Sequence, residues 1–158
     1  IIEEKFEEDA DKALAIYPAN DDKEMLDSSK RLLGDSLFGA PSYYAARAMA
    51  DRGEEIYFYH FNQKPSGKAG EILGAFHASE IAYVFGVGGL GPIEDPELSR
   101  IMLTYWTNFS KIGNPNGEDI PDWDTMKSKQ DTWHLLGPKI GQENISRMDI
   151  YNLLRRIS

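Results

Sequence analysis

The sequence predicts an α/β fold in which helices cover a small sheet. Segments with apolar residues at helical spacing alternate with short β-branched and aromatic runs, in the order helix, strand, helix, strand, helix. The chain has 158 residues, 41% of them hydrophobic, so it is long enough to bury a core within one domain. Two clear strands are few for an independent sheet, which indicates that the sheet needs more strands than this chain offers.

Three helices are expected before the first strand. In the first and the third, apolar residues recur on one helical face. A proline or a glycine follows the apolar pattern and is expected to end the helix. The expected ranges are Phe6–Tyr17, Asp22–Leu33 with Gly34 as its stop, and Pro41–Asp51.

Two runs are typical of strands. Ile56–Phe61 is β-branched or aromatic on both faces, which indicates a strand buried on both sides, as in a helix-covered parallel sheet. Thr132–Leu136 is a shorter strand of the same kind. Residues 62–73 contain proline, glycine, serine and lysine, and they are expected to form a surface loop.

The strongest helix pattern begins at Pro96. Asp95 is a candidate N-cap, proline suits the first helical position, and apolar residues recur at helical spacing over Leu98–Phe109. Gly113 is expected to stop this helix. A last helix is expected from Ser146 to Ile157.

Charge and cysteine content exclude several classes of partner and site. The chain carries 26 acidic and 17 basic residues, a formal net charge of −9, so we expect no nucleic-acid and no membrane partner. The longest nearly apolar stretch, Ile81–Leu90, is too short and glycine-rich to span a bilayer. The absence of cysteine excludes disulfides, thiolate metal sites and a cysteine nucleophile. The acidic segment at Ile1 lacks a methionine and an apolar core, so it is not expected to be a signal peptide.

His77 is the strongest candidate for chemistry. It follows a strand-type run and a loop, and α/β folds place their reactive groups at the carboxyl ends of strands. The small residues of Gly74–Ala75 and Ala78–Ser79 leave room for a substrate. A hydrogen-bonded structural histidine is the alternative. For His60 and His134 the structural interpretation is favoured, because each lies within a strand pattern.

Two patterns that suggest bound groups are rejected. His77 and Glu80 are spaced like a metal-binding pair, but Ile81 stands where the inverted zinc motif needs a histidine, so we expect no metal. Gly86–Gly91 matches G-x-G-x-x-G, yet the next helix pattern begins only at Pro96. We therefore interpret this segment as a flexible loop and expect no cofactor.

Three further patterns concern glycosylation, core packing and a local hydrogen bond. Asn108 and Asn144 begin glycosylation sequons, and the first is expected to stay unmodified because it lies within a helix pattern. The aromatic residues of Tyr105–Phe109 are expected to be core rather than a base-stacking platform. Asp35 is expected to form a local cap or a supporting hydrogen bond.

Several segments together resemble a known family. Gly74–Gly86, which contains Phe76-His77-Ala78-Ser79-Glu80, resembles the catalytic-histidine segment of type B carboxylesterases, the family of cholinesterases and bacterial para-nitrobenzyl esterases. Gly34–Pro41, Ile56–Phe61 and Ser99–Asn116 resemble further segments of that family in the same order. The resemblance extends over nearly the whole chain. Pro121–Trp123 departs from it, because the family usually has a Trp-Pro pair there.

This resemblance implies the C-terminal portion of an α/β-hydrolase fold, made of the last sheet strands with their covering helices. It implies hydrolysis of small-molecule esters by a Ser–Glu/Asp–His triad in which His77 is the histidine. By the same match, Phe76 and Ala78 flank the substrate pocket and Glu80 supports the histidine.

The resemblance also implies that the other triad members lie upstream. In this fold the serine occupies a G-x-S-x-G elbow that precedes the acid and the histidine, and residues 1–158 contain no such elbow. Glu54, Glu55 and Asp35 have no motif support as the acid. We therefore expect residues 1–158 to be one segment of a single domain that needs its N-terminal portion as a partner. Alone, the segment is expected to be inactive and to associate through an exposed apolar sheet edge.

Two other functions stay open from the sequence. One is a non-catalytic binding protein of the same fold, like the adhesion relatives of cholinesterases. The other is a free-standing interaction module, which would be monodisperse and fold cooperatively. The absence of cysteine suits a bacterial-type esterase better than disulfide-bearing animal relatives. A cytoplasmic, a periplasmic and a secreted location all stay open.

Overall fold

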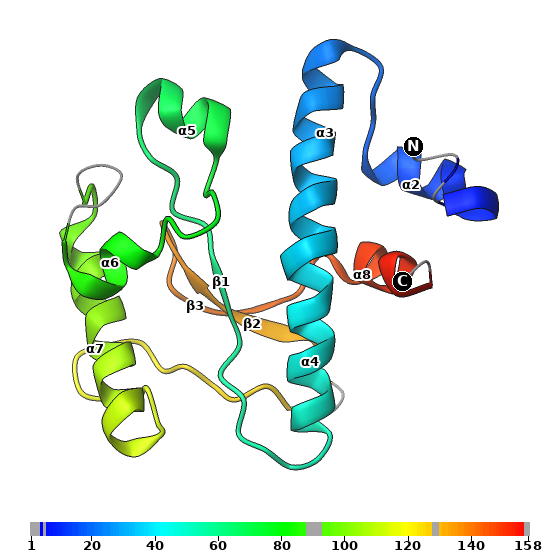
Figure 1. Cartoon of the computed structure of the whole chain (residues 1–158). Helices are drawn as coiled ribbons and strands as arrows, with labels where there is room; N and C mark the ends of the chain where they lie inside the picture. The colour runs from blue at the N-terminus through cyan, green and yellow to red at the C-terminus, as the bar shows by residue number, and fades with distance from the viewer. Residues whose placement is uncertain (1–3, 5, 88–92, 128–129, 157–158) are drawn as a thin grey trace. The chain divides into compact units, whose positions relative to one another are not determined.

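The computed structural model describes residues 4, 6–87, 93–127 and 130–156. The chain forms two compact units (Figure 1). Unit 1 comprises Ile1–Ile56, Lys127–Asp131 and Ile145–Ser158, and unit 2 comprises Tyr57–Met126 and Thr132–Asn144. Within the described ranges, no helix is long and apolar enough to cross a membrane.

Unit 1 is helical. The expected first helix is divided into one 3₁₀ turn and a short α-helix, and the last helix begins two residues later than predicted. The carboxylate of Asp21 accepts a hydrogen bond from the backbone N–H of Glu24 at 2.8 Å, which caps the second helix as Asp side chains commonly do. The helical elements are η1 (Glu7–Asp9), α2 (Ala10–Ile16), α3 (Asp22–Gly34), η2 (Asp35–Gly39), α4 (Ala40–Ala50) and α8 (Met148–Arg156).

Gly34 does not stop the second helix, contrary to the prediction. Its dihedral angles are helical (φ −61°, ψ −44°), and the chain continues through the π-helical η2 into α4. Figure 1 shows α3 and α4 as one long rod. A glycine within a helix costs about 1 kcal/mol relative to alanine. The next residue, Asp35 in η2, pairs with Arg147, which immediately precedes α8.

Asp35 joins three elements of unit 1. Its buried carboxylate accepts a hydrogen bond from the hydroxyl of Tyr17 at 2.6 Å and pairs with the guanidinium of Arg147 on the approach to α8. Burial, followed by the hydrogen bond to Asp35, raises the pKa of Tyr17 far above its usual value. The expected supporting hydrogen bond is therefore present, but it is not a local cap, because both partners are distant in the sequence.

Unit 2 contains, within its described residues, a three-stranded sheet in the order β1-β2-β3. β1 (Tyr59–Phe61) pairs in parallel with β2 (Thr132–Leu136), and β2 pairs antiparallel with β3 (Gly141–Asn144). The parallel pairing agrees with the parallel-sheet setting indicated for the first strand, and β2 has the predicted bounds. β3 was not predicted, because its polar sequence has no strand pattern and only its pairing with β2 makes it a strand.

The first strand is shorter and more exposed than predicted. Only Tyr59–Phe61 of the expected Ile56–Phe61 forms a strand, although the backbone N–H of His134 also donates to the carbonyl of Phe58 at 2.8 Å. Alternate residues Tyr57, Tyr59 and Phe61 pack against the core of unit 2. His60, on the other face, is exposed. Bulky side chains therefore occupy both faces, but the described part of unit 2 covers only one of them.

The predicted loop 62–73 contains a helix, α5 (Gly67–Leu73). A Cβ on Gly70 would stand 1.7 Å from the carbonyl oxygen of Pro65, so this glycine permits a close approach of two backbone segments. The backbone N–H of Ser66 donates to the carboxylate of Glu94 at 2.8 Å at the start of the helix. The prediction of a loop throughout 62–73 was therefore wrong. Gly70 and Pro65 mark a place where two backbone segments pack closely.

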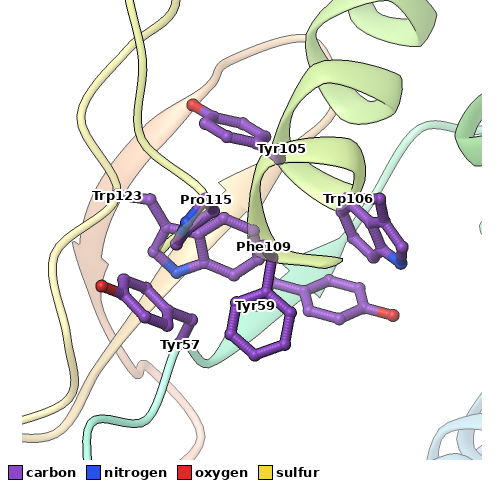
Figure 2. Close-up of a pocket in the computed structure, with 7 residues that line it drawn as sticks. All are labelled: Tyr57, Tyr59, Tyr105, Trp106, Phe109, Pro115 and Trp123. Atoms are coloured by element: carbon purple, nitrogen blue, oxygen red, sulfur yellow. The ribbon is translucent and has the colours of Figure 1, made fainter. Parts of the chain in front are cut away.

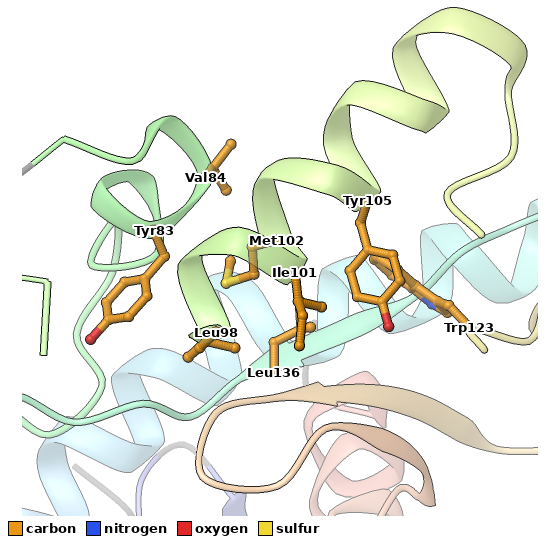
Figure 3. Close-up of a cluster of buried hydrophobic side chains, with 8 residues drawn as sticks. All are labelled: Tyr83, Val84, Leu98, Ile101, Met102, Tyr105, Trp123 and Leu136. Carbon is orange, nitrogen blue, oxygen red and sulfur yellow. The ribbon is translucent and has the colours of Figure 1, made fainter. Parts of the chain in front are cut away.

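The strongest predicted helix is confirmed as α7 (Pro96–Ile112). The carboxylate of Asp95 accepts from the N–H of Leu98 at 2.9 Å, and Gly113 ends the helix with φ +72°. The short helix α6 (Ile81–Phe85) packs against α7. Figure 3 shows the buried side chains that join α6, α7 and the sheet: Tyr83, Val84, Leu98, Ile101, Met102, Tyr105, Trp123 and Leu136.

Candidate functional site

His77 lies in a tight turn between α5 and α6. Gly74 ends α5 with φ +63°, a conformation that suits a residue without a side chain. The hydroxyl and the backbone N–H of Ser79 both donate to the carbonyl of Phe76, at 2.6 Å and 3.0 Å. His77 itself is exposed, while Phe76 and Ala78 on either side are half-buried. The turn therefore holds the imidazole at the surface of unit 2.

The residue after His77 has a strained backbone. Ala78 adopts φ +70°, in the left-handed region, which costs a residue with a Cβ roughly 1–2 kcal/mol. Its carbonyl accepts from the N–H of Ile81 at 3.3 Å, so the strained conformation is tied to the start of α6. Strain of this kind concentrates at functional sites, where the surrounding structure maintains it.

The turn is followed by a helix, α6, that is packed into the core of unit 2. Tyr83 and Val84 of α6 are buried in the core of unit 2. The buried hydroxyl of Ser99 on α7 donates to the carbonyl of Tyr83 at 2.8 Å. A loop anchored in this way can keep a side chain in one place, as binding and catalytic loops do.

Glu80 lies at the end of the same turn and is half-buried. Burial, followed by the negative charge of Glu80, raises the pKa of Tyr59 on β1. The negative charge of Glu80 therefore acts on Tyr59 in the sheet. The turn brings Phe76, His77 and Ala78 together, and support of His77 by Glu80 stays a prediction.

The other two histidines make structural contacts, as predicted. The ring of His134 is completely buried and stacks on Trp123, with the ring centroids 5.0 Å apart. Burial lowers the pKa of His134 to about 4, so the imidazole is neutral near pH 7. His60 stacks on Trp133 with the ring centroids 4.4 Å apart.

A cavity of about 200 Å³ opens in unit 2 between β1, α7 and the segment after α7. The sequence analysis missed it and assigned the aromatic stripe of Tyr105–Phe109 to the core. Tyr105 is buried, but Phe109 is 51% exposed. Helical spacing shows which residues share a face, but it does not show whether another element fills that face. Figure 2 shows the lining residues: Tyr57, Tyr59, Tyr105, Trp106, Phe109, Pro115 and Trp123.

The remaining motifs have plain structural settings. The amide of Asn108 donates to the carbonyls of Pro115 and Asn116, at 3.2 Å and 3.1 Å. Asn144 is exposed at the end of β3. Gly86 ends α6 with φ +65°, and Gly88–Gly91 of the glycine motif lie outside the described residues. Over the described ranges, no cluster of three or more histidines and carboxylates could hold a metal ion.

Comparison with known proteins identifies the family. The model of the carboxylesterase family matches residues 3–151. The chain belongs to the carboxylesterase family. Carboxylesterase 5A of Felis catus is 36% identical over 140 residues, which are 80% of this chain and 26% of that protein.

Other relatives of this carboxylesterase chain match over shorter stretches. The medium-chain fatty acyl-CoA hydrolase precursor of Anas platyrhynchos is 43% identical over 97 residues, which are 58% of this chain and 17% of that protein. Liver carboxylesterase of Sus scrofa is 40% identical over 99 residues, again 58% of this chain and 17% of that protein. The chain therefore spans about a quarter or less of the length of these relatives.

The family and the mixed architecture confirm the expected fold class, part of an α/β-hydrolase fold. The partial coverage agrees with the identification as a C-terminal part of a carboxylesterase. The relatives named here are vertebrate proteins, so they do not favour the bacterial-type esterase that the absence of cysteine suggested.

Proposed function

We propose that this carboxylesterase chain is the C-terminal segment of an esterase and supplies His77 as the triad histidine for hydrolysis of small-molecule carboxylic esters. The observation that carries the proposal is an exposed histidine on a strained turn that is anchored to a buried helix pair. This turn lies within Gly74–Gly86, which resembles the catalytic-histidine segment of the family.

The chemistry follows from the properties of a neutral imidazole. As the serine hydroxyl attacks the ester carbonyl, His77 accepts the hydroxyl proton and then donates it to the departing alkoxide, which leaves an acyl-serine. As water then attacks the acyl group, His77 accepts a proton from it. The bond between the acyl group and the serine oxygen breaks, the acid is released, and His77 returns the proton to the serine oxygen. Phe76 and Ala78 flank the ester, and Glu80 supports His77.

The serine and the acidic member are supplied by an N-terminal portion of the longer protein. Residues 1–158 contain no G-x-S-x-G elbow. A histidine without an activated nucleophile and an oxyanion hole lacks most of the rate enhancement of such enzymes. The chain by itself is therefore inactive.

The decisive experiment measures hydrolysis of para-nitrophenyl acetate by this chain and by the longer protein. In the longer protein, His77→Ala lowers kcat/KM by about 10⁴-fold or more, the scale seen when a triad member is removed. His60→Ala is the matched control, because His60 is also exposed in unit 2 but stacks on Trp133. This control keeps kcat/KM within a few-fold.

Two results would contradict the proposal. If the longer protein keeps its rate after His77→Ala, His77 is not the triad histidine. If the longer protein hydrolyses no ester and binds another protein instead, the non-catalytic alternative is correct.

A further inference from the structure

His77 lies on a segment of unit 2 that leaves the sheet and returns to the core. The chain leaves the sheet at Asn62, whose backbone N–H donates to the carbonyl of Leu136 at 2.9 Å. It then runs from Ser66 through α5, the His77 turn and α6 to Tyr83, which is buried in the core. The orientation of the turn therefore depends on what fixes Ser66 at one end and Tyr83 at the other.

Glu94 fixes the first end of this segment. Its two carboxylate oxygens accept from the backbone N–H of Ser66 at 2.9 Å and 2.8 Å, and one of them also accepts from the Ser66 hydroxyl at 3.0 Å. Hydrogen bonds to a charged acceptor are shorter and stronger than those between neutral groups. Gly67, the next residue, adopts φ +64°, so the chain turns sharply into α5 directly after the residue that Glu94 binds.

Glu94 also lies at the second end. Burial raises the pKa of Tyr83, and the next largest influence, the backbone N–H of Glu94 bonded to the Tyr83 hydroxyl, lowers it. Tyr83 belongs to the same buried cluster as Leu98, in the first turn of α7 (Figure 3). The side chain of Glu94 therefore contacts the start of α5, and its backbone contacts α6.

The position of Glu94 is set by the start of α7. The side chain of the next residue, Asp95, accepts from the N–H of Leu98 at 2.9 Å, and its carbonyl accepts from the N–H of Ser99 at 3.1 Å. The hydroxyl of Ser99 in turn donates to the carbonyl of Tyr83 at 2.8 Å. The exposed carboxylate of Glu94 is therefore attached to a helix that is packed into the core.

Hydrogen bonds within the segment connect its first end to the turn. The N–H of Gly74 donates to the carbonyl of Gly70 at 3.0 Å where α5 ends. Within the turn, the N–H of Ser79 donates to the carbonyl of Phe76 at 3.0 Å. Because α5 leads directly into the turn, a change in the orientation of α5 moves His77.

We propose that Glu94 is a positioning residue for His77: its carboxylate binds Ser66 and so keeps α5 and the turn in the orientation that places the imidazole. This inference rests on the proposed role of His77 as the triad histidine. Such a histidine must lie within about 2.6–3.2 Å of the serine hydroxyl, and a misplacement of about 1 Å can lower the rate about 10²-fold.

The test measures kcat and KM for para-nitrophenyl acetate in the longer protein. Glu94→Ala is expected to lower kcat about tenfold or more and to change KM less than about twofold, because His77 acts in both formation and breakdown of the acyl-serine. Glu94→Gln keeps an oxygen that accepts from the N–H of Ser66, so it is expected to recover most of kcat. Glu97→Ala is the matched control, because Glu97 is also exposed near the start of α7 but pairs with Arg100.

A substitution of Ser66 tests the other side of the contact. Proline removes the N–H that donates to Glu94, and its fixed φ of about −65° suits the φ of −73° at Ser66. Ser66→Pro is expected to lower kcat as Glu94→Ala does, and the double variant is expected to be no worse than either single variant.

Hydrogen–deuterium exchange of the longer protein gives a measurement apart from activity. Peptides that cover residues 74–81 are expected to exchange faster in Glu94→Ala than in the unsubstituted protein, whereas peptides that cover β2 are expected to be unchanged. Faster exchange in β2 as well would overturn the proposal in favour of a general role in stability.

The kinetic outcomes separate this inference from the proposed function. If His77→Ala abolishes hydrolysis but Glu94→Ala keeps kcat, the positioning role is wrong and the role of His77 stands. A raised KM with unchanged kcat, or an equal loss in Glu94→Ala and Glu97→Ala, would also overturn the positioning role. If His77→Ala keeps its rate, the proposed function fails and the positioning role fails with it.

Discussion

The hydroxyl oxygen of Tyr105 lies 3.2 Å from Nε2 of His134, and both side chains are completely buried. The hydroxyl donates its hydrogen to the carbonyl of Pro121 at 2.6 Å. Its oxygen is therefore left to accept a hydrogen bond from the histidine, which assigns the proton of the neutral imidazole to Nε2. This pair joins α7 to β2 and makes an uncharged His134 part of the core of unit 2.

Acidification is expected to destabilise the fold through His134. Its pKa of about 4 in the folded chain lies below the ordinary value of 6.5, because burial disfavours the charged ring. The unfolded chain therefore binds this proton more readily. The free energy of unfolding is unaffected by His134 above about pH 7 and falls as the pH drops from 6.5 toward 4, by up to about 3 kcal/mol.

Urea unfolding at pH 7 and pH 5 tests this dependence, with His134→Gln as the comparison. The variant removes the titrating group, so we expect its free energy of unfolding to change less between the two pH values. An equal change in both proteins would show that other groups cause the acid sensitivity.

Gly39 is expected to be intolerant of a side chain, unlike Gly34. A Cβ on Gly39 would lie 2.7 Å from the hydroxyl oxygen of the buried Tyr151, whereas a Cβ on Gly34 would meet nothing within 4 Å. Both glycines have helical backbones. Gly34→Ala should therefore raise the free energy of unfolding by about 1 kcal/mol, as alanine does within a helix. Gly39→Ala should lower it by roughly 1–3 kcal/mol through overpacking.

Thermal or urea unfolding of the two alanine variants measures this contrast. Tyr151→Phe in the Gly39→Ala background removes the nearest atom and should restore part of the loss. If both glycine variants are stabilised, Tyr151 does not lie as close to η2 as described.

The half-buried ion pair of Asp35 and Arg147 in unit 1 is expected to be sensitive to loss of one partner. Asp35→Ala leaves the guanidinium of Arg147 and the hydroxyl of Tyr17 without this acceptor, and it should cost about 1–3 kcal/mol of unfolding free energy. The exposed pair of Glu97 and Arg100 is the control, and Glu97→Ala should cost at most about 1 kcal/mol.

A double variant distinguishes the energy of the Asp35–Arg147 interaction from the cost of leaving Arg147 without its partner. Asp35→Ala with Arg147→Met should be more stable than Asp35→Ala alone, because no half-buried cation is left without its partner. Additive effects of the two substitutions would contradict a direct coupling between these residues.

The chain alone is expected to self-associate. Leu33 on α3 and Leu37 on η2 are 60% and 57% exposed and lie one helical turn apart. Apolar groups exposed together favour association. Sedimentation velocity should show oligomers at micromolar concentration, and the double variant Leu33→Glu/Leu37→Lys should reduce them. Ile112→Lys, at the end of α7, is the control and should have a smaller effect. A monodisperse monomer with a cooperative melt would instead support a free-standing module.

Local signals determined the elements whose ends are set by their own residues. Asp95 and Gly113 cap α7 through bonds and dihedral angles that involve only nearby backbone, so the sequence predicted the helix closely. β2 was also predicted with its observed bounds, Thr132–Leu136. The sequence of the turn around His77 carried the family resemblance, but its strained Ala78 became visible only in the structure.

Long-range contacts decided the rest. Glycine often ends a helix, yet Gly34 and Gly70 both lie within helices, and Gly70 does so where the backbone of Pro65 approaches it closely. The cavity beside Trp106 depends on which elements pack against α7, and periodicity along one helix cannot show that. By itself, the sequence determined the fold class, the family resemblance and the candidate histidine. The tertiary structure alone decided the paths of the helices, the third strand and the aromatic cavity, because burial and close approach depend on residues far apart in the chain.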